Sequence, residues 1–233
     1  AYTGGVNIAD EYANIIERFG YWKDSGVCLE GEGAWGLTAS FIRMCVNLGG
    51  VMHNEHDYYR PHTPVKSEGF CQPFTDGPQN NPDNPAEDVF LQMISGARRF
   101  LYITTPYFIP DESLMRALCI AGDGGVDVRL MLPGKPDHWY ADCVAESYFG
   151  ELIKHGVKVY RYTPGFLHGK SIMVDREAAF VGSANMDYRS FELDYECGVM
   201  VYSVPMIESL LEDMDMICLL YTSPSPRDRT RSR

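Results

Sequence analysis

Short apolar runs alternate along the chain with longer segments that have helical spacing. The short runs are rich in β-branched and aromatic residues and have the length of buried strands. We predict strands at 100–105, 126–132, 157–162, 171–174, 179–181 and 197–202. We predict helices at 33–46, 85–98, 112–121, 137–155 and 207–215. This alternation indicates an α/β fold in which helices cover the faces of a sheet.

A polar stretch separates two parts of this pattern. Residues 75–85 are rich in proline, asparagine and aspartate, and a second polar segment lies at 53–68. A short candidate strand at 69–74 lies between them. Because such composition is typical of loops, we place a boundary between two halves of the chain in this region.

Composition and charge narrow the classes of function. The chain has 233 residues, 45% of them hydrophobic, and a formal net charge of −12. This is an ordinary globular composition with an acidic excess. The excess argues against a nucleic-acid binder, because such proteins neutralise phosphates with lysine and arginine. No apolar run reaches the ~18–20 residues that span a bilayer, so the chain as it stands is expected to be soluble.

Potential metal ligands are scattered. The seven cysteines have no metal-ligand spacing, and their odd number and dispersion are typical of a reduced, cytosol-facing protein. His53, His56 and His62 form a loose cluster, for which a solvated loop is favoured over a metal site. We therefore expect no metal and no other cofactor.

The residues that carry chemistry are concentrated between positions 166 and 196. His168 and Lys170 are two positions apart, so on an extended strand their side chains face the same side. An imidazole that can attack phosphorus or carry a proton then lies beside a positive charge suited to phosphate. Glu196 is a candidate acceptor for the other imidazole N–H of His168.

A glycine-containing segment adds phosphate-binding chemistry. Gly182 allows a ligand to approach the backbone closely, while the Ser183 hydroxyl and the Asn185 amide can donate hydrogen bonds to phosphate oxygens. Taken alone, His168 is more simply a core histidine and Lys170 an ordinary charge at a strand end. The placement of six residues of suitable chemistry within 18 positions argues against that simpler interpretation for the whole set.

These residues, together with Asp175, have the spacing HxK-x4-D-x6-GSxN, which resembles the signature of the phospholipase D superfamily. The resemblance implies mixed sheets flanked by helices in two homologous halves, with one motif from each half meeting at a single site. One histidine attacks phosphorus to form a phosphohistidine, and the other serves as general acid and then as general base. The implied catalytic residues are His168, Lys170, Glu196 and Asp175, the last as structural support, and the implied phosphate ligands are Lys170, Ser183, Asn185 and Asn7.

A weak internal repeat supports two halves. Residues 1–8 (AYTGGVNI) and 179–186 (AFVGSANM) share three identities at an offset of 178, although chance is an alternative explanation. Applied to His168, the offset places a partner histidine before residue 1, so the chain is expected to hold half of an active site. Asp24 is a candidate for orienting that missing histidine, and an exposed strand charge is the alternative.

The resemblance extends to bacterial cardiolipin synthases through residues 2–7, 10–12, 19–24, 103–110, 117–119, 125–129, 136–140, 162–165 and 185–190. It implies a phosphatidyltransferase that condenses two phosphatidylglycerols into cardiolipin and glycerol. It also implies phospholipid partners and a cytoplasm-facing catalytic part in the cell membrane, with membrane helices that this chain lacks. Alternatives are a phospholipase D hydrolase, a nuclease (which the acidic charge disfavours) and a non-catalytic lipid-binding fragment. The aromatic pairs at 107–108 and 139–140 are candidates for lining the lipid site, with core packing the favoured alternative.

We therefore expect three regions. Residues 1–66 are the remnant of a first phospholipase D-like half, and residues 67–217 are a second half that carries the motif. Residues 218–233 are interpreted as non-native, because CLLYTSPSPRD can be encoded by DNA that resembles the adapter of transposon-based sequencing libraries. Residues 219–233 are accordingly expected to pack against nothing.

Overall fold

The computed structural model of the chain describes residues 1–52, 60–61, 65–66, 69–78, 84–202 and 205–222. Eight strands form its main sheet in the order β14-β8-β7-β5-β10-β11-β13-β4. Their bounds are β4 Phe70–Asp76, β5 Phe100–Thr104, β7 Asp127–Pro133, β8 Lys158–Tyr162, β10 Ser171–Val174, β11 Ala178–Gly182, β13 Glu196–Tyr202 and β14 Tyr221–Thr222. The pairs β5–β7 and β7–β8 are parallel and the other pairs are antiparallel, so the sheet is mixed, as the predicted fold class required.

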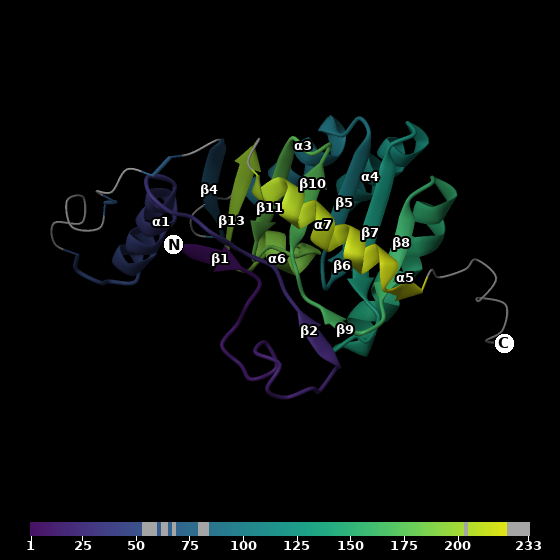
Figure 1. Cartoon of the computed structure of the whole chain (residues 1–233), viewed down its shortest axis with the longest axis horizontal. Helices are drawn as coiled ribbons and strands as arrows, with labels where there is room; N and C mark the ends of the chain where they lie inside the picture. Colours follow the sequence, from purple (N-terminus) through teal and green to yellow (C-terminus); the bar gives the residue numbers. More distant parts are fainter. Residues whose placement is uncertain (53–59, 62–64, 67–68, 79–83, 203–204, 223–233) are drawn as a thin grey trace.

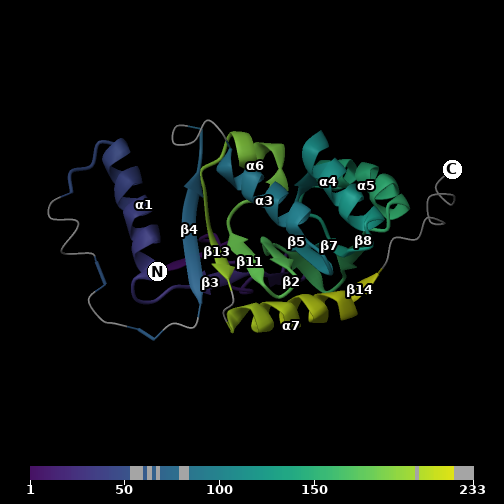
Figure 2. The ribbon, with the colours of Figure 1, turned by 90° about the horizontal axis from the view of Figure 1, so that it is seen from above.

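Helices cover both faces of this sheet (Figures 1 and 2). One face carries α3 (Pro85–Gly96), α4 (Glu112–Asp123), α5 (Trp139–Lys154) and the short α6 (Tyr188–Glu192), and the other carries α7 (Met206–Leu219). Helix α1 (Gly33–Asn47) lies beside β4, where Gly36 contacts Pro73 of that strand. All five predicted helices and the seven predicted strands are therefore present, with small differences at their ends.

The two sides of the sheet have separate cores because residues alternate along each strand. On β5, Leu101 and Ile103 point into the core under α3, α4 and α5, whereas Tyr102 points into the core under α7. The same alternation separates Phe180 from its neighbours Ala179 and Val181 on β11. This burial on both faces explains why the strands read as continuous apolar runs in the sequence.

Short strands that the sequence did not predict attach the first residues of the chain to this body. Strand β1 (Tyr2–Gly4) pairs with β3 (Gly26–Cys28), and β2 (Tyr21–Lys23) pairs with β9 (Gly165–Leu167). Near the carboxyl end of β5, β6 (Phe108–Ile109) pairs with β12 (Met186–Asp187). Strands of two or three residues are too short to display a period of two, so pattern alone does not reveal them.

The expectation that residues 219–233 pack against nothing is wrong for the first of them. Strand β14 pairs antiparallel with β8, and the Leu220 carbonyl oxygen accepts hydrogen bonds from the Thr163 amide at 3.1 Å and the Thr163 hydroxyl at 3.0 Å. Residues 223–233 lie outside the described residues, as do His53, His56 and His62. Among the described residues, no helix combines the length and apolar character needed to cross a bilayer.

Candidate active site

A pocket of about 500 Å³ opens where β1, the start of β13 and the ends of β9 and β11 come together. Six of the predicted site residues line it: Asn7, His168, Lys170, Ser183, Asn185 and Glu196. They come from both ends of the sequence, because β1 and β3 pack against β11 and β13. Asp24 adjoins the pocket through a direct contact with His168, whereas Asp175 lies elsewhere.

The contact between Asp24 and His168 follows from a strand register. The parallel pairing of β2 with β9 aligns Lys23 with Leu167, so the next residues on each chain, Asp24 and His168, come together. His168 Nδ1 lies 2.7 Å from Asp24 Oδ2, and the two side chains are 8% and 7% exposed. This burial is incompatible with the alternative that Asp24 is an exposed strand charge. The contact with His168 also corrects the expectation that Asp24 orients the missing histidine.

Aromatic rings enclose the imidazole of His168. The ring of Tyr12 meets it edge-on with centroids 5.1 Å apart, and the rings of Trp22 and Phe166 lie 5.3 and 5.7 Å away. Burial lowers the pKa of His168, although the hydrogen bond with Asp24 raises it, and the charge of Lys170 lowers it further. The imidazole is therefore neutral at physiological pH, with its tautomer set by the carboxylate.

Lys170 lies directly against the imidazole, as the two-residue spacing predicted. Its Nζ donates a hydrogen bond to the His168 carbonyl oxygen at 2.7 Å and lies 2.9 Å from each ring nitrogen. Burial lowers the pKa of Lys170 to about 8, against the opposing charges of Asp24 and Glu196. A buried ammonium group next to a neutral imidazole provides a binding position for an anion.

The predicted contact between Glu196 and His168 is wrong. The Glu196 carboxylate instead accepts hydrogen bonds from the hydroxyls of Ser183 and Ser190. Glu196 begins β13 and reaches these serines, while the position beside His168 is occupied by Asp24 from a distant part of the chain. Burial raises the pKa of Glu196 above its ordinary value, although the two serine hydrogen bonds oppose this shift.

The absence of a side chain at Gly5 leaves room for Asp24 and Lys170 beside the imidazole of His168. A Cβ atom added at Gly5 would lie 2.4 Å from Asp24 Oδ1 and 3.0 Å from Lys170 Nζ. Only a residue without a side chain leaves room for the carboxylate and the ammonium group. On the other side of the pocket, the backbone N–H of Asn185 donates to the Ser190 hydroxyl at 2.9 Å, and Asn185 Oδ1 is buried without a partner among the described residues.

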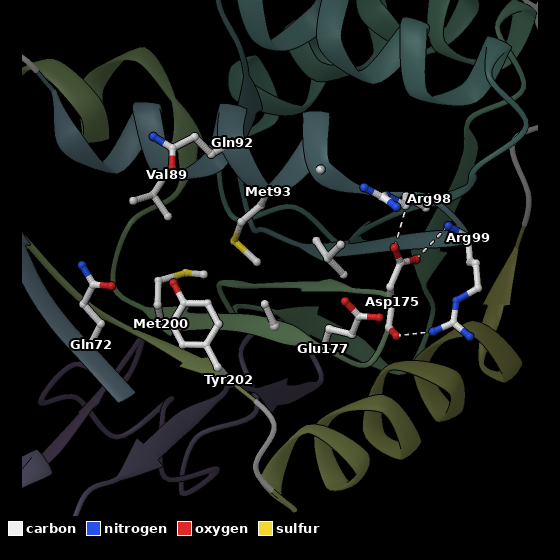
Figure 3. Close-up of a pocket in the computed structure, with 13 residues that line it drawn as sticks. Gln72, Val89, Gln92, Met93, Arg98, Arg99, Asp175, Glu177, Met200 and Tyr202 are labelled. Carbon is white, nitrogen blue, oxygen red and sulfur yellow. Dashed lines mark hydrogen bonds between the residues drawn. The ribbon is translucent and has the colours of Figure 1, made fainter. Parts of the chain in front are cut away.

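Asp175 is at the far end of β10 from the pocket, so its assignment to the catalytic set is corrected to the supporting role. Its carboxylate accepts hydrogen bonds at 2.8 Å from the backbone N–H groups of Arg98 and Arg99 (Figure 3) and from that of Phe100. The Arg99 guanidinium donates to the Asp175 carbonyl oxygen at 2.6 Å. Asp175 therefore joins the turn after β10 to the start of β5. Although burial raises its pKa, the three backbone hydrogen bonds lower it below its ordinary value.

Replacement of Asp175 by alanine is expected to lower the free energy of unfolding by roughly 3 kcal/mol, because three backbone donors lose a charged acceptor. Because folding depresses the pKa of Asp175, its contribution is complete above the unfolded pKa of about 4 and is lost as the pH falls further. Urea unfolding followed by circular dichroism measures both effects. Asp123→Ala, at a carboxylate that is 60% exposed, is the matched control. A loss below about 1 kcal/mol in Asp175→Ala would contradict this role.

The aromatic pairs at 107–108 and 139–140 divide between different surroundings. Tyr107 lines the pocket, whereas Phe108 is completely buried in the core under α5. Trp139 and Tyr140 are 75% and 56% exposed at the start of α5, so core packing does not describe them. Sequence reasoning gave no role to Tyr12 or Ser190, although they lie in the segments 10–12 and 185–190 that carried the family resemblance.

The sequence of the chain is similar to those of known proteins. Residues 90–218, more than half of the chain, match the family model described as "Cardiolipin synthase, PLD-like domain". The chain belongs to this family. It is 38% identical over 221 residues to a cardiolipin synthase of Listeria welshimeri, covering 92% of this chain and 45% of the relative. It is 39% identical over 213 residues to a cardiolipin synthase of Halalkalibacterium halodurans, covering 91% of this chain and 42% of the relative. The chain thus spans about half the length of the curated relatives it matches.

Solved structures show the same fold at lower identity. The phosphatidylserine synthase of Haemophilus influenzae superposes with a TM-score of 0.70 and 14% identity, covering 95% of this chain and 60% of that one. A phospholipase D family member from Salmonella typhimurium, Nuc, superposes with a TM-score of 0.56 and 22% identity, covering 67% of this chain and 98% of that one. The fold is therefore that of the phospholipase D superfamily.

Proposed function

We propose that the protein is a phosphatidyltransferase of the cardiolipin synthase type, which condenses two phosphatidylglycerols into cardiolipin and glycerol. The observation that carries this proposal is the pocket in which His168, Asp24 and Lys170 form one buried cluster. A neutral, oriented imidazole beside an ammonium group suits chemistry on an anionic phosphodiester. Family membership directs this chemistry towards phospholipids.

We further propose that the chain contains parts of two homologous halves, as the repeat suggested. The β1–β3 ladder pairs Gly4 with Gly26, and the β11–β13 ladder pairs Gly182 with Gly198. Two residues before the second glycine of each pair stand Asp24 and Glu196, respectively. This agreement in register supports the repeat independently of the sequence identities.

The equivalence gives Glu196 a new role in the proposal. Asp24, from the first half, contacts His168, from the second half. By the same relation, Glu196 from the second half is the carboxylate for a second imidazole that the first half supplies. Ser183 and Ser190 hold the Glu196 carboxylate at the pocket wall, where such a ring would meet it. In this scheme each carboxylate orients a histidine from the other half, and activity requires both imidazoles.

The proposed reaction has two steps. The second imidazole attacks phosphorus, a P–N bond forms, and the bond from phosphorus to the glycerol oxygen breaks while His168 supplies a proton to the leaving alcohol. The hydroxyl of a second phosphatidylglycerol then gives its proton to His168, its oxygen bonds to phosphorus, and the P–N bond breaks. An incoming phosphodiester anion raises the proton affinity of His168, which favours the acid form in the first step. Lys170, Asn185 and Asn7 are the proposed phosphate ligands, whereas Ser183, expected among them, gives its hydroxyl proton to Glu196.

Vesicles of phosphatidylglycerol and the full-length protein provide the test. We expect equimolar cardiolipin and glycerol, measured by mass spectrometry and an enzymatic glycerol assay. Phosphatidic acid without cardiolipin would instead identify a hydrolase, and vesicle binding without turnover would identify a lipid-binding module.

Because the substrates reside in a bilayer and all seven cysteines are free thiols, we place the site at the cytoplasmic face of the cell membrane.

The role proposed for Lys170 predicts a characteristic pH dependence. Since its folded pKa is lowered to about 8, the ammonium group loses its proton as the pH rises through that value, and kcat/KM is expected to fall. In Lys170→Arg the guanidinium remains charged, so the remaining activity is expected to lose this alkaline limb. Lys158→Arg, at a lysine that is 55% exposed on β8, should retain it. An unchanged alkaline limb in Lys170→Arg would assign the titration to another group.

A further inference from the structure

Two tyrosines in the pocket have no part in the reaction as described above. Tyr12 lies between β1 and β2, and Tyr107 lies just before β6, yet both line the pocket that contains His168. Each hydroxyl is held by neighbouring side chains, and that of Tyr107 also lies 3.4 Å from His138 Nδ1. The Tyr107 hydroxyl donates to Asp137 Oδ2 at 2.6 Å, and the Tyr12 hydroxyl accepts from Asn7 Nδ2 at 3.0 Å.

Tyr12 and Tyr107 are called here the tyrosine wall of the pocket. The direction of their two hydrogen bonds determines what this wall can bind. A phenol has one proton to donate and lone pairs to accept. Tyr107 has given its proton to Asp137, so it offers a ligand only lone pairs. Tyr12 accepts the amide proton of Asn7, so its own proton is available to a ligand. One fixed acceptor and one available donor are complementary to an alcohol hydroxyl, which both donates and accepts.

This wall differs in character from the phosphate-binding side of the pocket. A phosphodiester presents only acceptor oxygens, so the lone pairs of Tyr107 do not suit it, whereas the ammonium group of Lys170 does. Burial and the hydrogen bond to Asp137 raise the pKa of Tyr107, so its hydroxyl remains protonated and its bond direction is kept. The Tyr12 ring lies 5.1 Å from the His168 ring, which places the wall beside the imidazole that handles the proton.

We propose that Tyr12 and Tyr107 form a subsite for the hydroxyl groups of a glycerol head group, which selects a diol as the acceptor of the phosphatidyl group. The inference rests on the proposed transferase function and adds the group that recognises the acceptor. A vicinal diol offers one hydroxyl group to each tyrosine, while a simple alcohol of the same length has only one to offer. The same chemistry is present in free glycerol and in the head group of phosphatidylglycerol.

Competition between alcohols tests the subsite in the full-length protein. Phosphatidylglycerol vesicles are incubated with deuterated glycerol and 1-propanol together, and mass spectrometry gives the ratio of deuterated phosphatidylglycerol to phosphatidylpropanol. The ratio of cardiolipin to phosphatidic acid reports the lipid-borne diol in the same sample. Both ratios are independent of the fraction of folded enzyme, so partial misfolding of a variant does not affect them.

In Tyr107→Phe and Tyr12→Phe we expect at least one of these ratios to fall by roughly three- to tenfold, as the loss of one hydrogen bond predicts. Tyr202→Phe, at the opposite end of β13 from Glu196 and outside the pocket, should retain the wild-type ratios. Wild-type ratios in both pocket variants would overturn the subsite while leaving the transferase intact. A wild-type protein that forms neither cardiolipin nor an alcohol adduct would refute the transferase function, and the subsite with it.

Discussion

Replacement of His168 by asparagine is expected to lower phosphatidyl transfer by the full-length protein by roughly 10³-fold or more, because acid–base catalysis in both steps is lost. Asparagine fits within the space of the imidazole but cannot carry a proton at neutral pH. The measurement is the initial rate of cardiolipin formation from phosphatidylglycerol vesicles, with thermal unfolding as a check on the packing against Trp22 and Phe166.

A matched control is available at His155. This histidine is bonded to Asp123 and Glu151 at the end of α5 and lies outside the pocket. His155→Asn should keep the wild-type rate of transfer. If His168→Asn retained more than about a tenth of that rate with unchanged unfolding, His168 would not be the proton carrier.

The second large effect is expected from Asp24→Asn, with a loss of transfer of roughly 10²- to 10³-fold. The Asp24 carboxylate accepts the N–H at Nδ1 of His168, which leaves Nε2 to give and accept the proton in the two proposed steps. An asparagine amide can donate to Nδ1 instead, and this favours the tautomer with the proton on Nε2. The substitution should also lower the pKa of His168 further, since Asp24 raises it.

Nuclear magnetic resonance of the ring nitrogens of His168 separates this orienting role from a loss of folding. In Asp24→Asn we expect the tautomer to change and the imidazole pKa to fall. Glu196→Gln is the informative comparison, because Glu196 contacts Ser183 and Ser190 and not the imidazole. If Glu196→Gln changed the tautomer and Asp24→Asn did not, the assignment of the two carboxylates would have to be reversed.

Much of the main sheet could be predicted from the sequence. The central strands of the main sheet are buried on both faces, so their apolar runs are continuous, and the helices between them have a single apolar stripe. Helix α7 illustrates the latter, with Ile207, Leu210, Leu211 and Met214 buried at helical spacing. The motif residues of the pocket could also be predicted, because their spacing reflects local geometry between β9 and β11.

The support of the imidazole could not be predicted in the same way. Asp24 and His168 are 144 positions apart, and their contact depends on the register of two three-residue strands, β2 and β9. Glu196 lies nearer to His168 in sequence and has suitable chemistry, so it was the natural choice. Proximity along the chain misled here because β13 places Glu196 against the serines.

The sequence by itself determined the helices and the longer strands, the sheet-and-helix layers and most of the polar groups that line the pocket. These follow from periodicity and short-range spacing, which each segment carries independently. Only the tertiary structure decided which carboxylate holds His168, showed which backbone groups Asp175 binds and brought Tyr12 and Tyr107 into the same pocket. These features depend on long-range packing and strand register, so no local pattern encodes them.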